Sequence, residues 1–148
     1  MNQAPSYIHT QYGQILRIGL CAGGILYLVL LVLKLGTALP VISGITIAFL
    51  FSIGWVFGSL TVQVTPKTLS WHFGPGFWNK SIEREQIESV RATRTKWWYG
   101  FGIRLTPHGW LYNVQGLDAV QVTDKNGKST LIGTDQPESL VRALNSKH

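Results

Sequence analysis

The chain has 148 residues, of which 45% are hydrophobic, and it carries a formal net charge of +6 at pH 7. This length leaves room for one small folded domain beside any apolar helices, and a single cysteine excludes an intramolecular disulfide framework. Only Arg17 and Lys34 are charged among the first sixty residues, and the remainder holds eleven basic minus seven acidic residues, or +4. Nucleic-acid binding usually needs a denser basic stripe, so we do not expect it.

Two uncharged, apolar runs dominate the first half of the chain. They cover residues 18–33 and 35–66, and only Lys34 separates them. Each run can supply the roughly 20 apolar residues that a helix needs to cross a bilayer core of about 30 Å. We therefore predict a transmembrane helical hairpin in residues 1–60, with helices at about 13–33 and 40–60. A cleaved signal peptide is not expected, because the polar segment 1–14 contains no lysine or arginine.

Small residues recur at helical spacing in both apolar runs. Gly19 and Gly23 form one such pair, and Gly54 and Gly58 form another. They predict packing of the two helices on each other, or homo-oligomerisation through one stripe. Neither run has an ionisable residue in its interior, which argues against transport by this chain alone. The few flanking cations favour a multi-pass orientation with both termini, and the domain that follows, in the cytoplasm.

After Leu60 the hydrophobic period changes to two residues, which is typical of strands. The alternation predicts seven or eight short, mainly antiparallel strands, at 61–65, 69–73, 78–82, 89–95, 103–106, 110–114, 119–123 and 129–132. The polar segment 83–86 is expected to form one helical turn, and Asn126-Gly127 predicts a hairpin. Asp135-Gln136-Pro137-Glu138 has the spacing of a capping box before a final helix. Residues 61–148 are thus predicted to form a β-sandwich or barrel closed by a C-terminal helix.

The second half of the chain resembles a known family in three segments. These are Tyr99-Gly100-Phe101-Gly102-Ile103-Arg104, residues 109–120, and Ile132-Gly133-Thr134-Asp135. Together with the order of elements, they are similar to small bacterial membrane proteins that contain a pleckstrin-homology-like (PH-like) domain. The resemblance implies a PH-like fold of two bent antiparallel sheets and a location in the bacterial inner membrane. It implies no established activity and no catalytic residues.

No pattern of catalytic or metal-binding residues stands out. The four histidines are widely dispersed, and no pair has metal-ligand spacing with a cysteine or carboxylate. Gly127-Lys128-Ser129-Thr130 imitates the end of a phosphate-binding loop but lacks its first glycine. The chain has no Gly-x-Ser-x-Gly motif, and its cysteine lies in the first apolar run. We therefore predict that the protein is not an enzyme and has no cofactor and no bound metal.

One cluster combines cations with aromatic residues. It comprises Arg91, Arg94, Lys96, Trp97, Trp98, Tyr99 and Arg104. Such a cluster could bind anionic lipid headgroups, with the tryptophans at the interface. The plainer alternative is that Trp97 and Trp98 complete the core or contact the hairpin. Stacking on single-stranded nucleic acid is the least favoured use.

These observations favour a membrane-tethered binding or scaffolding module, integral to the bilayer, with a cytoplasmic PH-like domain. The alternative is an accessory subunit whose glycine-striped helices pack into a larger, transporter-like membrane complex. The expected partners are lipid headgroups or another membrane protein, and not nucleic acid.

Overall fold

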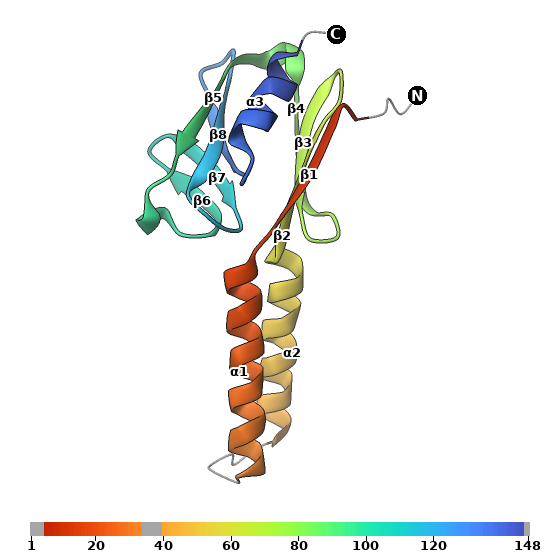
Figure 1. Ribbon diagram of the computed structural model, residues 1–148, viewed down its shortest axis with the longest axis vertical. Helices are drawn as coiled ribbons and strands as arrows, with labels where there is room; N and C mark the ends of the chain where they lie inside the picture. The colour runs from red at the N-terminus through yellow and green to blue at the C-terminus, as the bar shows by residue number, and fades with distance from the viewer. Residues whose placement is uncertain (1–4, 34–39, 147–148) are drawn as a thin grey trace.

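The computed structural model describes residues 5–33 and 40–146. A β-rich part, which we call the β domain, stands on two long helices, the helix pair (Figure 1). The elements in chain order are β1 (Tyr7–Tyr12), α1 (Gln14–Val32), α2 (Pro40–Phe57), β2 (Ser59–Val64), β3 (Thr68–Phe73), β4 (Phe77–Glu83), η1 (Arg84–Gln86), β5 (Ile87–Arg94), η2 (Trp97–Tyr99), β6 (Gly102–Thr106), β7 (Gly109–Asn113), β8 (Asp118–Asp124), β9 (Ser129–Gly133) and α3 (Pro137–Asn145), where η1 and η2 are 3₁₀ turns.

The strands form two sheets. The first has the order β1-β2-β3-β4 and the second β5-β8-β9-β7-β6. Every strand pair is antiparallel except β7 and β9, which run parallel. The helical turn predicted within 83–86 is confirmed as η1, and the Asn-Gly hairpin between β8 and β9 and the C-terminal helix are confirmed as well. The second sheet is mixed, whereas the family resemblance implied antiparallel sheets.

The helix pair is inserted between two neighbouring strands of the first sheet. Strand β1 pairs with β2 along its whole length, from Tyr7 opposite Val64 to Tyr12 opposite Ser59. The backbone N–H of Gly13 then donates to the carbonyl of Gly58 at 2.9 Å, which joins the start of α1 to the end of α2. The β domain therefore includes a strand from before the helices, which the hydrophobic pattern did not indicate.

The predicted transmembrane hairpin is wrong. Within residues 5–33 and 40–146, no helix has both the length and the apolar character needed to cross a membrane. The second uncharged run does not stay helical to residue 60, because α2 ends at Phe57 and the chain turns into β2. The helices have 19 and 18 residues, so at about 1.5 Å per residue they are shorter than a bilayer core of about 30 Å.

This finding also overturns the predictions that depended on the hairpin. The multi-pass inner-membrane location and the cytoplasmic orientation of the termini lose their basis, as does the description of the chain as a membrane protein. The predicted connection at 34–39, including Lys34, lies outside the described residues.

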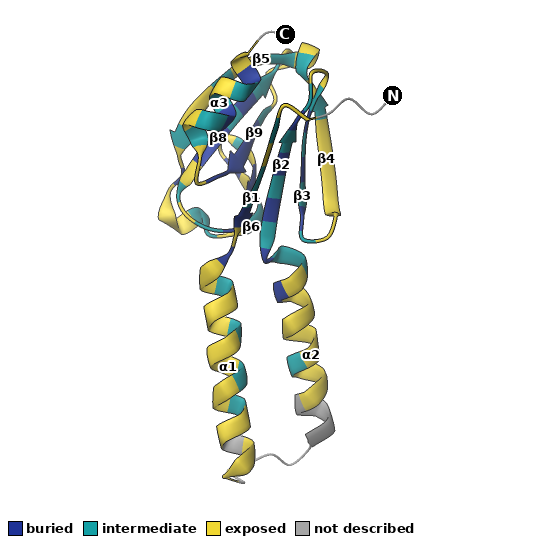
Figure 2. Cartoon of the chain, turned by 45° about the vertical axis from the view of Figure 1, so that its right-hand side comes forward, coloured by how far each residue is buried: buried dark blue, intermediate teal, exposed yellow. Residues whose placement is uncertain are grey.

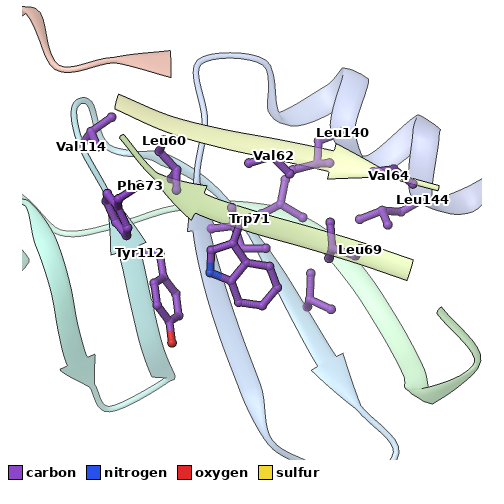
Figure 3. Packing of buried hydrophobic residues seen from close by; sticks show 13 residues of the cluster. Leu60, Val62, Val64, Leu69, Trp71, Phe73, Tyr112, Val114, Leu140 and Leu144 are labelled. Atoms are coloured by element: carbon purple, nitrogen blue, oxygen red, sulfur yellow. The ribbon is translucent and has the colours of Figure 1, made fainter. Parts of the chain in front are cut away.

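The core lies between the two sheets. Strands β2 and β3 bury every second residue, and the most enclosed are Val64, Leu69 and Phe73, each with no measurable exposure. Figure 3 shows these side chains facing Tyr112 of β7 and Leu140 of α3. Period-two burial of β-branched and aromatic residues explains why the strand predictions here were correct.

Helix α3 covers the end of this core, and hydrogen bonds from other parts of the β domain reach the residues at each of its ends. At its C-terminal end, Arg84 of η1 donates to the carbonyls of Leu144 and Ser146 at 2.7 and 2.8 Å, which satisfies carbonyls left unpaired there. At its start, the N-cap is Gln136, and no side chain caps the helix. The predicted capping box is therefore wrong, because the carboxylate of Asp135 bonds His9 instead.

Candidate functional site: the basic and aromatic residues after strand β5

The two arginines of β5 lie on opposite faces of an edge strand. Arg91 pairs with Gln121 and Arg94 with Asp118, three residues further along the ladder. Because side chains alternate between faces, this odd spacing separates them. Arg91 donates from Nε and Nη2 to the amide oxygen of Gln121 at 3.0 and 2.7 Å. Arg94 lies 3.8 Å from Asp118, and both side chains are largely exposed. The predicted cluster is thus not one continuous surface.

The residues after β5 do form a compact group. Thr95 is buried and anchors the chain, because its N–H and its hydroxyl both donate to the carbonyl of Leu117. The chain then turns through η2 and presents Trp97 and Trp98 to the outside, 75% and 59% exposed. The ammonium of Lys96 lies 5.0 Å from the centre of the Trp98 ring, within cation–π distance. Neither tryptophan belongs to the core cluster, so the alternative that they complete the core is wrong.

Arg104 of β6 joins this group across a tight turn. Its Nε donates to the carbonyl of Phe101 at 3.1 Å. The turn uses Gly100 at a positive φ of 67°, a backbone conformation that favours glycine, and Gly100 lies next to the Arg104 guanidinium. We call Lys96, Trp97, Trp98, Phe101 and Arg104 the η2 cluster. It excludes Arg91, Arg94 and the partly buried Tyr99 of the predicted cluster, and it adds Phe101, which the sequence analysis did not single out as a site residue.

An apolar groove adjoins the η2 cluster where the β domain meets the helix pair. Its volume is about 570 Å³, and it is lined by Ile15, Leu16, Phe57, Phe101 and Val114, among others. Phe101 belongs to both features and is 44% exposed. Of the η2 cluster, only Phe101 lines this apolar groove, so the groove adjoins the cluster through that ring. An apolar groove next to a cluster that holds Lys96 and Arg104 suits a partner with both charged and apolar parts.

The helix pair carries much of the exposed apolar surface of the protein (Figure 2). Its large exposed side chains include Ile18, Ile25, Val32, Ile45, Phe49 and Trp55. Contiguous apolar surface of this kind usually marks a binding surface. Gly24 and Gly54 face side chains of the opposite helix, whereas Gly19, Gly23 and Gly44 have no such neighbour among the described residues.

The other candidate groups do not come together. Among the described residues, no three histidine, cysteine or acidic side chains lie close enough to hold a metal ion. His9 contacts Asp135, while His148 lies outside the described part of the chain. Cys21 is exposed on α1. The comparisons with family models, with curated proteins and with solved structures gave no match to this chain.

Proposed function

We propose that the protein is a non-catalytic binding module that attaches to anionic lipid surfaces through the η2 cluster. The observation that carries this proposal is the exposure of Trp97 and Trp98 on one turn, with the ammonium of Lys96 over the Trp98 ring. Arg104 of β6 adds a second cation beside the turn through its bond to the Phe101 carbonyl. Tryptophan favours the interface between headgroups and acyl chains, and each nearby cation contributes about 1 kcal/mol toward an anionic surface. The apolar groove beside Phe101 offers room for apolar parts of the same lipid.

The test is co-sedimentation of the full chain with vesicles of anionic or zwitterionic lipid, at low and moderate salt. The full chain is needed because β1 lies outside a fragment that starts at residue 61. We expect anionic vesicles to be preferred, and Lys96→Gln and Arg104→Gln each to lower that preference about five-fold, the equivalent of about 1 kcal/mol. Trp97→Ala should weaken binding to both kinds of vesicle.

Lys125→Gln is the matched control, because this lysine lies in the β8–β9 turn, away from the η2 cluster. It removes the same charge and should leave the anionic preference within two-fold of the unmodified protein. Equal losses for Lys125→Gln and Lys96→Gln would show that only overall charge matters, which would refute the proposed site.

A second candidate is an accessory subunit that packs into a larger assembly through the helix pair. The exposed apolar side chains and the open face over Gly19 and Gly23 favour it, since small residues let another helix approach closely. Co-purification at a fixed stoichiometry that is lost on Gly19→Leu but kept in Trp97→Ala would support this function. Retention of the complex in Gly19→Leu would exclude this helix face as the interface.

A further inference from the structure

A second cavity lies within the β domain, between the two sheets. Its volume is about 440 Å³, and it is lined by aromatic and charged residues that include Trp71, Trp78, Lys80, Trp110, Tyr112 and Lys128. The exposed edge strand β4 contributes one side, and strands of the second sheet contribute the other. This size falls within the range of small-molecule pockets, which are mostly apolar with a few polar groups.

Trp71 lines this cavity with an unused hydrogen-bond donor. The side chain is only 2% exposed, and its Nε1 has no hydrogen-bond partner among the described residues. Figure 3 shows the indole nitrogen on the side of the ring nearest Tyr112, which packs against it at 5.3 Å between ring centres. A buried donor without a partner costs about 1–3 kcal/mol. A ligand that brought an acceptor atom to this indole would recover part of that free energy.

Two exposed tryptophans flank the same space. Trp78 is 58% exposed and Trp110 is 41% exposed, although both border the cavity. Trp78 also has a positive φ of 53°, the only such non-glycine residue among those described. This backbone conformation is unusual for a bulky residue, and strained positions of this kind concentrate at binding sites. Two accessible indole faces are suited to contact a planar aromatic ring.

The charges around the cavity favour an anion. Lys80 lies opposite Trp71 in the β3–β4 ladder, and Lys128 follows the β8–β9 turn. Neither ammonium forms an ion pair with a described residue. Asp124 also lines the cavity, but one of its carboxylate oxygens accepts hydrogen bonds from the N–H groups of Asn126 and Lys128 at 2.9 and 2.8 Å. The cavity is therefore lined by two cations and one carboxylate, and the carboxylate is already hydrogen-bonded within the β8–β9 turn.

We propose that this cavity binds a small planar aromatic anion. The ring contacts Trp78 and Trp110, an acceptor atom of the ligand accepts a hydrogen bond from the indole N–H of Trp71, and Lys80 and Lys128 attract the negative charge. This cavity shares no residue with the η2 cluster, so binding of an aromatic anion here can be tested independently of lipid binding.

The experiment is a titration of the full chain with 2-naphthoate, followed through the N–H signals of the six tryptophan indoles in a ¹⁵N-correlated NMR spectrum. Trp71→Phe identifies the Trp71 signal. If that variant does not fold, the signal is assigned by elimination from Trp→Phe variants at the other five positions. We expect the Trp71 indole proton to move downfield in a saturable manner, as hydrogen bonding to an acceptor requires.

Variants and a neutral analogue make the test specific. Trp78→Ala and Lys128→Gln should each weaken 2-naphthoate binding at least five-fold, whereas Trp97→Ala in the η2 cluster should leave it unchanged. 2-Naphthalenemethanol, which lacks the charge, should bind at least five-fold more weakly than 2-naphthoate. The proposal is overturned if the Trp71 signal does not move, if Trp78→Ala and Lys128→Gln bind 2-naphthoate as tightly as the unmodified protein, or if the neutral analogue binds equally well.

Discussion

His9 and Asp135, which are 126 residues apart in the sequence, are joined by a contact of 2.5 Å between the imidazole Nε2 and a carboxylate oxygen. His9 belongs to β1, before the helix pair, and Asp135 lies just before α3. The contact therefore connects the first strand of the β domain to the start of its last helix.

We expect this contact to contribute modestly to stability. The side chain of Asp135 is 57% exposed, so solvent screening limits the pair to about 1 kcal/mol or less. A double-mutant cycle with His9→Gln and Asp135→Asn, measured by chemical denaturation, should give a coupling energy above zero. The longer and more exposed pair of Arg94 and Asp118 serves as a control. A larger coupling energy for Arg94 and Asp118 than for His9 and Asp135 would contradict this prediction.

Gly109 and Gly127 should respond very differently to alanine. Both have positive φ, 111° and 78°, so each substitution carries a backbone cost of about 1–2 kcal/mol. A Cβ at Gly109 would also meet the backbone carbonyl of Ser129, whereas one at Gly127 meets open space. Gly109→Ala should lower the free energy of unfolding by more than Gly127→Ala, by at least about 1 kcal/mol. Equal losses would show that the β7–β9 approach can relax.

Phe73 and Phe77 are opposite each other in the β3–β4 ladder but differ in burial. Phe73 is fully buried and packs near Phe57 and Tyr112, while Phe77 is 56% exposed. Phe73→Ala should cost about 3–5 kcal/mol because it leaves a cavity in the core. Phe77→Ala should cost less than about 1 kcal/mol by the same denaturation measurement. A small loss at Phe73 would mean that the core collapses to fill the space.

Two tyrosines should make the β domain sensitive to alkaline pH. Burial raises the pKa of Tyr112, and burial together with the nearby charge of Asp135 raises the pKa of Tyr7, against an opposing contribution from Thr134. A raised pKa means that the folded state holds the phenolic proton more tightly than the unfolded state. The resulting stability is fully present below the unfolded pKa of about 10 and is lost as pH rises through the folded pKa.

The measurement is the free energy of unfolding between pH 8 and pH 11. Tyr112→Phe should flatten its decline above pH 10, because phenylalanine has no proton to lose. Tyr12→Phe, at an exposed tyrosine, is the matched control. An unchanged slope in Tyr112→Phe would show that other groups govern alkaline unfolding.

Much of the β domain could be predicted from local sequence. Alternation at Val62 and Val64 indicates one buried face of a strand, and Asn126-Gly127 favours a tight hairpin whatever surrounds it. Such patterns are read from a few adjacent residues, so no distant contact is needed to interpret them. The aromatic turn with an adjacent cation, Lys96-Trp97-Trp98, could also be predicted from the sequence.

Contacts between distant segments decided the rest. The strand formed by residues 7–12 exists because β2 supplies its partners 47 to 57 residues later in the chain. Pairing of β2 with β1 also requires α2 to end at Phe57, before the second apolar run ends. Strand register placed Arg91 and Arg94 on opposite faces, and the turn at Gly100 let Arg104 bond the carbonyl of Phe101. The cavity at Trp71 joins residues from both sheets. Composition and periodicity therefore determined which segments are helices or strands, whereas pairing between remote segments determined where they end and which side chains share a site.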